Sequence, residues 1–267
     1  MREARFDARG SVIRWTEAPG EGPATVFVHG LGAASTVYHA HIAARRELAG
    51  RRVLFVDLPG HGISDRPADF GYTLEEYADA LATVLDTAGV SGGVIAGHSM
   101  GGSVAIVLAD RRPDLVSRLV VTEGNLDPFP PVKAGSSGIA SYMEDEFVHG
   151  GGFARVLERV GPTWAATMRL ADPLALHRTA THLVRGTEPP MRELLLRNAR
   201  AERVYLQGEL SGELAGADGL RAAGVDVVVV PGAGHNIMFD NPDAFARAVA
   251  GEGAAARPLP EPGVRRS

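Results

Sequence analysis

The chain has no cysteine and a single lysine, Lys133, and only 6% of its 267 residues are aromatic. Without cysteine there can be no disulfide, no thiolate nucleophile and no thiolate ligand for a metal ion. Any nucleophile in a catalytic site must therefore be a residue of another type. We also find no cluster of His, Asp and Glu with metal-ligand spacing, so the sequence indicates neither a metal nor a cofactor.

Excess positive charge and long hydrophobic runs are also absent. The chain carries 32 acidic and 27 basic residues, and no basic stripe of the kind that binds nucleic acid. Its longest apolar runs have the length of a strand, well below the roughly 18 residues that span a bilayer. Residues 1–7 alternate in charge and do not resemble a signal peptide. We therefore expect a cytoplasmic protein with neither nucleic acid nor membrane as a partner; its oligomeric state stays open.

Short apolar runs rich in β-branched residues alternate with longer helical patterns along the chain. Because these runs lack polar alternation, they predict strands buried on both faces, as in a parallel sheet. Two further segments, 5–7 and 11–15, predict a hairpin at one sheet edge. Repeated strand–helix alternation predicts an α/β fold with a doubly wound sheet. The buried strands are predicted at 26–28, 53–56, 94–96, 119–122, 204–206 and 225–230.

One long stretch, residues 126–201, interrupts this alternation because it contains helical patches and no convincing central strand. An insertion at this point of an α/β protein would lie at the carboxyl edge of the sheet, where ligands bind, and would form a lid. The predicted division is a core in 1–125 and 202–250, a helical lid in 126–201 and a disordered tail in 251–267. The apolar lid residues that could line a pocket or pack within the lid are Tyr142, Met143, Phe147, Trp164, Met168 and Leu170.

The most informative motif is a G-x-S-x-G pattern from Gly97 to Gly101, directly after a predicted strand and before a predicted helix. A nucleophilic serine on such a strand-to-helix turn sits in a strained conformation, and small residues on either side let the chain pack closely. The turn would expose the hydroxyl of Ser99 at the positive end of the helix. Ser99 is therefore the predicted nucleophile, and a glycine-rich turn with a helix-capping serine is the structural alternative.

A serine nucleophile needs a base, and His235 follows the last predicted strand on a glycine-rich loop. Loops at the carboxyl ends of parallel strands converge, so His235 can approach Ser99. Acyl transfer also needs N–H donors for the oxyanion. We predict the backbone N–H groups of Met100, the residue after the nucleophile, and of Leu31, in the glycine-flexible loop after the strand at 26–28. The side chain of His29 is expected to be structural.

Four motifs together resemble the α/β-hydrolase family: HGLG at 29–32, DLPGHGIS at 57–64, GHSMGG at 97–102 and PGAGH ending at His235. The resemblance covers about residues 12–249. It implies an α/β-hydrolase fold with a sheet of about eight strands, a serine nucleophile, a late histidine, a lid after the sixth strand and no cofactor. Family members mostly hydrolyse esters, thioesters, lactones, epoxides or carbon–carbon bonds beside ketones.

The chain departs from the family pattern at the acid of the triad. Ser211 stands where the family usually has Asp, after the seventh strand. The histidine still needs an acceptor at Nδ1 to fix its tautomer. Glu123, which follows the sixth strand, is our first candidate, because some family branches, including the haloalkane dehalogenases, carry their acid there. Glu209, and after it Glu213 or Asp127, are the alternatives, and a chain without any triad acid stays open.

These features predict a serine-dependent hydrolase that acts on a small acyl substrate, a carboxylic ester, thioester or lactone, through a Ser–His–acid triad and an acyl-enzyme. Dehalogenation and epoxide hydrolysis are disfavoured because they need a carboxylate at the position of Ser99. The alternative is a catalytically silent or non-hydrolytic protein of the same fold that binds a small molecule under the lid. A dinucleotide site at Gly30 and Gly32, with Asp57 as its acidic residue, is a weaker hypothesis, since we expect Asp57 to be structural or at the edge of the site.

Overall fold

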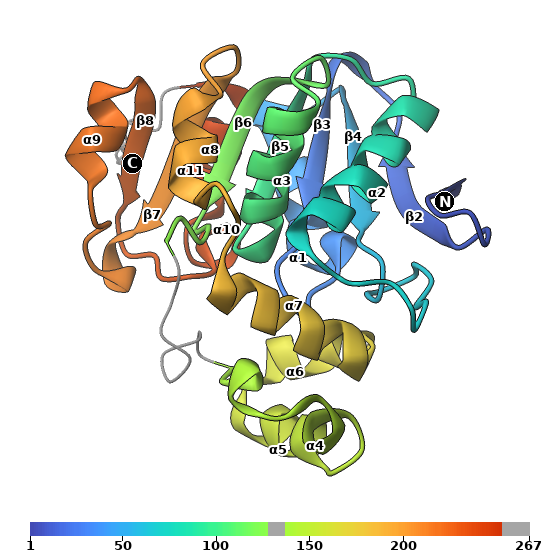
Figure 1. Ribbon diagram of the computed structural model, residues 1–267. Helices are drawn as coiled ribbons and strands as arrows, with labels where there is room; N and C mark the ends of the chain where they lie inside the picture. Colours follow the sequence, from blue (N-terminus) through green and yellow to red (C-terminus); the bar gives the residue numbers. More distant parts are fainter. Residues whose placement is uncertain (128–136, 253–267) are drawn as a thin grey trace, which may run out of the picture.

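The computed structural model describes residues 1–127 and 137–252. From residue 253 onward the predicted disordered tail lies outside the described residues. Eight strands of the described chain form one sheet in the order β1-β2-β4-β3-β5-β6-β7-β8 (Figure 1). The strands are β1 (Arg2–Arg5), β2 (Val12–Ala18), β3 (Glu21–Val28), β4 (Arg51–Asp57), β5 (Gly93–His98), β6 (Val116–Thr122), β7 (Glu202–Gly208) and β8 (Val225–Val230).

The sheet is mostly parallel, as the apolar runs predict. β2 pairs antiparallel with β1 and with β4, and every pairing from β4 through β3, β5, β6 and β7 to β8 is parallel. The predicted hairpin at the sheet edge is present, although its first strand, β1, lies a few residues earlier than the sequence suggested. Parallel pairing brings the carboxyl ends of β3, β5, β6, β7 and β8 to one edge of the sheet.

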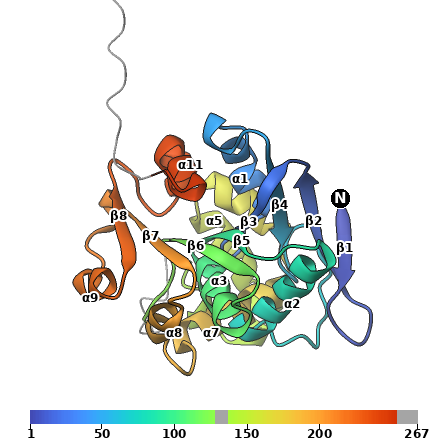
Figure 2. The same cartoon turned by 90° about the horizontal axis from the view of Figure 1, so that it is seen from above.

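Helices cover both faces of this sheet. Figure 2 shows α1 and α11 on one face and α2, α3 and α8 on the other. The helices are α1 (Ser35–Ala43), α2 (Leu74–Thr87), α3 (Met100–Arg111), α4 (Glu144–Val148), α5 (Gly152–Arg159), α6 (Pro162–Met168), α7 (Pro173–Arg185), α8 (Met191–Arg197), α9 (Ala217–Ala222), α10 (Ile237–Asp240) and α11 (Pro242–Ala250), with short 3₁₀ turns at Arg46–Leu48, Ile139–Ser141 and Glu209–Ser211.

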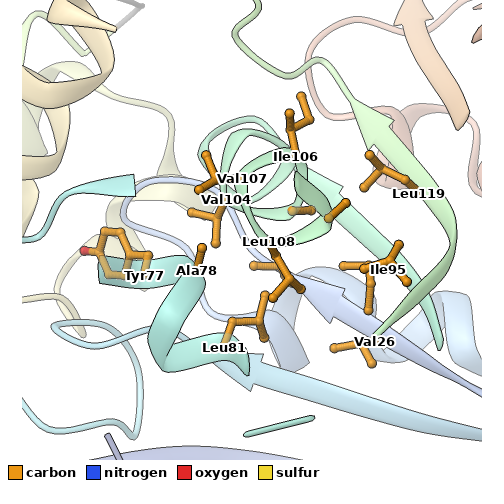
Figure 3. Close-up of a cluster of buried hydrophobic side chains, with 14 of the residues drawn as sticks. Val26, Tyr77, Ala78, Leu81, Ile95, Val104, Ile106, Val107, Leu108 and Leu119 are labelled. Atoms are coloured by element: carbon orange, nitrogen blue, oxygen red, sulfur yellow. The ribbon is translucent and has the colours of Figure 1, made fainter. Parts of the chain in front are cut away.

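Alternate residues of the central strands enter two separate cores. In β3, Val26 and Val28 pack with α2 and α3, whereas Phe27 packs with α1 and α11 on the opposite face. The first core surrounds α3, where Val104 and Leu108 meet strand and helix side chains (Figure 3). Each such Val, Leu or Ile contributes about 1.5–3 kcal/mol when fully buried. Burial on both faces explains why these strands show no polar alternation.

Local signals fix the start of α2. The hydroxyl of Thr73 accepts a hydrogen bond from the Glu76 N–H at 3.2 Å, and the Glu76 carboxylate accepts one from the Thr73 N–H at 3.1 Å. This is the capping box that the sequence predicts, and it satisfies two N–H groups that a helix start otherwise leaves unpaired.

The segment between β6 and β7 is helical where it is described. Helices α4 to α7 gather at one end of the sheet (Figure 1) and share a small core that includes Ile139, Phe147, Val156, Met168 and Leu176. Helix α8 belongs to another group, because its Met191, Leu194 and Leu195 join the core around α3. The predicted insertion at 126–201 includes both groups. Among the described helices, none is both long and apolar enough to cross a bilayer.

Candidate active site

Ser99 lies on a sharp turn between β5 and α3. Its backbone has φ 52° and ψ −119°, a conformation with positive φ that costs a side-chain-bearing residue about 1–3 kcal/mol. The chain around it packs too closely for larger residues. A Cβ on Gly97 would lie 2.3 Å from the carbonyl oxygen of Gly101, and a Cβ on Gly101 would lie 2.4 Å from that of Val28. The pattern of glycines therefore reflects backbone contact, as the motif predicts.

His235 and Glu123 meet at the same edge of the sheet. The imidazole Nδ1 of His235 lies 3.4 Å from the carboxylate Oε2 of Glu123, at the long end of hydrogen-bond distances. The His235 side chain is 51% exposed, whereas that of Glu123 is 9% exposed. Ser99 and His235 line one cavity, and within the described residues no hydrogen bond joins their side chains.

Glu123 is held in place from β7. Its backbone has φ 52°, and its N–H donates to the carbonyl of Leu206 at 3.0 Å. The carboxylate Oε1 accepts the N–H of Gly208 at 2.6 Å, which leaves Oε2 facing His235. Parallel pairing of β6 and β7 positions both contacts, because it brings the residue after β6 beside the end of β7.

The other carboxylates that we considered have different contacts. Glu209 accepts the N–H of Gly232 at 2.8 Å and is not part of the cavity wall. Asp127 forms a two-point ion pair with Arg192, at 3.0 and 2.5 Å. Glu213 lines the cavity, as does Ser211, which stands at the position of the usual family acid. Among the described residues, Glu123 is the carboxylate that makes a hydrogen bond with His235.

The predicted oxyanion donors lie on both sides of Ser99. Met100 is the first residue of α3, and Leu31 lies in the loop after β3. Neither N–H donates a hydrogen bond to another described residue. The loop comes close to Ser99, because a Cβ on Gly30 would lie 3.3 Å from Cβ of Ser99. Both N–H groups thus remain available to a ligand.

His29 and Asp57 are structural, in agreement with our interpretation. The His29 ring donates from Nδ1 to the carbonyl of Gly30 at 2.7 Å and accepts the N–H of Leu58 at Nε2 at 3.0 Å. Complete burial lowers the pKa of His29, so the ring is neutral. The Asp57 carboxylate accepts the N–H groups of Ser35 and Ile63. These bonds tie the loops after β3 and β4 together and leave Asp57 engaged in the fold.

The sequence reasoning missed the role of His98. Its Nε2 donates to the backbone carbonyl of His235 at 2.9 Å, and the two rings lie 4.9 Å apart. Burial, followed by the proximity of His235, lowers the pKa of His98 well below its usual range, so this ring too is neutral. The signal that could have found it is its position at the end of β5, directly before Ser99. Sequence alone does not reveal which distant loop that ring meets.

A cavity of about 680 Å³ connects these residues, a size typical of small-molecule sites. Its walls come from the loops at the strand ends, including the segment after β7, and from helices α1, α6 and α7. Of the six apolar residues singled out between β6 and β7, Trp164 lines the cavity and donates from its indole N–H to the carbonyl of Leu31 at 2.8 Å. Phe147 and Met168 pack inside the helical group, whereas Met143 and Leu170 are exposed. Tyr142 packs against that group.

Comparison with known proteins finds segments of this chain that are similar to a lipase, a hydrolase and an esterase. A segment of 101 residues is 43% identical to the sn-1-specific diacylglycerol lipase ABHD11 of Mus musculus and covers 38% of this chain and 32% of that protein. A segment of 116 residues is 38% identical to a 2-hydroxymuconate semialdehyde hydrolase of Pseudomonas putida, covering 43% and 41%. A segment of 179 residues is 33% identical to the esterase Rv0045c of Mycobacterium tuberculosis, covering 66% and 54%. Each match thus spans less than two thirds of the relative.

Solved structures extend the likeness over nearly the whole chain. An esterase of Exiguobacterium antarcticum superposes with a TM-score of 0.73 at 20% identity, over 93% of this chain and 97% of that one. A hydrolase of Pseudomonas aeruginosa gives a TM-score of 0.69 at 25% identity, over 92% and 96%. The model of the alpha/beta hydrolase family matches residues 25–248. The chain therefore belongs to the alpha/beta hydrolase family and has its fold.

Proposed function

We propose that the protein is a serine hydrolase that cleaves a carboxylic ester, thioester or lactone through an acyl-enzyme. The observation that carries this proposal is the convergence of Ser99, on its strained turn, and His235, with the Glu123 carboxylate at Nδ1, on one cavity. Relatives named as a lipase, an esterase and a semialdehyde hydrolase support hydrolysis and differ in substrate.

In the first half of the reaction, the Glu123 carboxylate accepts the proton on Nδ1 of His235 in a hydrogen bond, so Nε2 carries a free lone pair. That nitrogen takes the hydroxyl proton of Ser99 as the Ser99 oxygen forms a bond to the substrate carbonyl carbon. The carbonyl π electrons move onto oxygen, and the N–H groups of Leu31 and Met100 donate to this oxyanion. Glu123 stabilises the imidazolium that forms.

In the second half, the oxyanion collapses and the bond to the leaving group breaks. The leaving group takes the proton from Nε2 of His235, and the acyl group stays on Ser99. Water then loses a proton to the same nitrogen and attacks the acyl carbonyl. Collapse of this second tetrahedral species releases the carboxylic acid and returns the proton to Ser99. A hydrogen bond between nucleophile and base often tightens only in the complex with substrate, so its absence between Ser99 and His235 in the described structure is compatible with this step.

Helices α6 and α7 act as the lid in this proposal. They supply Trp164, Ala180, Leu183 and Val184 to the cavity wall above the strand ends. Apolar side chains at this position exclude water from the reacting carbonyl, which strengthens the contacts of the oxyanion.

Turnover of short-chain p-nitrophenyl esters tests the proposal. Ser99→Ala and His235→Gln should each lower kcat by at least about 10³-fold, because each removes a group that acts in the transition state. Matched controls are Ser91→Ala and His149→Gln, which change the same residue types at exposed positions and should stay within about twofold of the wild type. Full activity in Ser99→Ala would overturn the proposal. A wild type that turns over no ester would favour a silent binding protein.

A further inference from the structure

Six apolar side chains from two helices and two loops make up what we call the apolar wall of the cavity next to Ser99. Helices α6 and α7 contribute part of it, and the loops after β3 and β6 contribute the rest. Hydrocarbon groups gain about 25 cal/mol for each Å² that they bury against such a surface. The residues that form this wall are Leu31, Leu126, Trp164, Ala180, Leu183 and Val184.

The charged groups of the cavity are all acidic where the structure describes its lining. Glu123, Asp127 and Glu213 contribute carboxylates, and neither Arg nor Lys is among the described lining residues. Arg192 reaches Asp127 from outside the lining, and two of its guanidinium nitrogens are engaged by that carboxylate. Glu213 is exposed and forms no ion pair with a described residue.

An acyl group with its own carboxylate would therefore meet an unfavourable site. It would lose its hydration on entry, and burying an unpaired charge is costly. Within the described lining it would find carboxylates rather than a guanidinium or ammonium group, so repulsion would add to the loss of hydration. An uncharged hydrocarbon acyl group has neither cost and gains from the apolar wall.

We propose that the cavity selects esters whose acyl group is uncharged and mainly hydrocarbon and rejects acyl groups that bear a carboxylate. This selectivity rests on the proposed hydrolase function and assigns it a substrate class. Glu213 contributes to the rejection, because its charge is not neutralised by a neighbour in the described structure.

Three p-nitrophenyl esters with matched chains test this selectivity: the 6-methylheptanoate, the 5-carbamoylpentanoate and the hydrogen adipate. Their acyl groups end in an isopropyl, a carboxamide and a carboxylate group of similar shape, so polarity and charge vary in separate steps. The adipate should show a kcat/KM at least about 100-fold below that of the 6-methylheptanoate, with the carboxamide between them. An adipate rate within about threefold of the hydrocarbon ester, or above it, would overturn the inference.

Glu213→Gln tests the contribution of that carboxylate. At low ionic strength the variant should reduce the ratio of kcat/KM for the carboxamide ester to kcat/KM for the carboxylate ester by about threefold. The effect is small because the Glu213 side chain is exposed and its charge is screened. Glu158→Gln is the control, since it removes an exposed carboxylate of α5 that is not part of the cavity wall. An unchanged ratio in Glu213→Gln, or an equal change in Glu158→Gln, would contradict the role of Glu213.

Calorimetric titration of Ser99→Ala with the three corresponding methyl ketones separates selectivity from catalysis. The ketones should bind in the same order as the esters react. Binding in that order without any wild-type turnover would overturn the hydrolase proposal alone. Preferential binding of the carboxylate ketone would overturn the selectivity, whether or not the esters are hydrolysed.

Discussion

His98 and His235 are linked by a hydrogen bond from the Nε2–H of His98 to the backbone carbonyl of His235, at 2.9 Å. The residue before the proposed nucleophile thus holds the loop that carries the proposed base. His98 is 4% exposed, and its Nδ1 has no partner among the described residues. The single bond from Nε2 is therefore its specific polar contact, and we interpret His98 as a positioning residue.

Replacing His98 separates this contact from simple packing. His98→Phe keeps a ring but removes the donor, so kcat should fall by about tenfold or more with little change in KM, because the His235 loop is no longer held. His98→Gln retains an N–H donor near the same position and should recover most of the lost kcat. Equal kcat losses in both variants, with equal losses of Tm, would indicate a packing role instead.

The identity of the triad acid is tested by Glu123→Gln beside Glu209→Gln. In Glu123→Gln the new amide carbonyl would accept the N–H of Gly208, which turns the amide NH₂ toward Nδ1 of His235. That arrangement favours the tautomer with the proton on Nε2, which cannot accept the Ser99 proton, so kcat should fall by about 10²-fold or more. Glu209 accepts only a loop N–H, and Gln can do the same, so Glu209→Gln should stay within about threefold of the wild type.

Steady-state kinetics of both variants on one ester show which of the two carboxylates is the triad acid. A large loss in Glu209→Gln together with an active Glu123→Gln would assign the acid to the end of β7 and would contradict the contact that we describe.

Buried histidines predict a loss of stability on acidification. Burial, with a smaller contribution from neighbouring His29, lowers the pKa of His39 and of His61 to about 3 from 6.5. The unfolded chain therefore binds protons between about pH 6.5 and 3 that the folded chain does not, and stability falls as pH falls through this window. At pH 5 each of these two histidines should lower the free energy of unfolding by about 2 kcal/mol relative to neutral pH.

Urea unfolding between pH 5 and 7 measures the slope of the unfolding free energy against pH. His39→Gln should reduce the slope by about one proton, whereas His149→Gln, which replaces an exposed histidine, should leave it unchanged. The measured quantity is a slope, so the test holds even if His39→Gln is less stable at every pH. An unaltered slope in His39→Gln would contradict this account, because it would mean that His39 binds protons equally in the folded and unfolded states.

Much of the fold could be predicted from the sequence because its signals are local. The run at 94–96 is apolar on both faces, so β5 follows from composition alone, and Thr73 with Glu76 marks the start of α2 within one helical turn. Ser99 could be named from its motif for the same reason, since the glycines are required by backbone contacts within the turn and with β3.

The features that could not be predicted depend on contacts between segments far apart in the chain. The bond from His98 to His235 joins the last residue of β5 to the loop after β8, and no residue pattern within either segment encodes it. The packing of α8 on α3 could not be predicted for the same reason. The apolar face of α8 could pack in a lid or in the core equally well, and only the tertiary structure shows that it joins the core around α3. Glu123 could be proposed because Ser211 lacks a carboxylate and some family branches carry their acid after the sixth strand, whereas the hydrogen bond that holds Glu123 at Gly208 depends on the register of β6 and β7.

The central claim, that Ser99 is an activated nucleophile, is tested most directly by fluorophosphonate labelling followed by intact-mass and peptide mass spectrometry. Wild-type protein should gain one phosphonyl group, on the peptide that contains Ser99, and Ser99→Ala should gain none. His235→Gln should label at least about 10²-fold more slowly, because the hydroxyl then lacks its base. Wild-type protein that stays unlabelled, or labels equally in Ser99→Ala, would contradict the account.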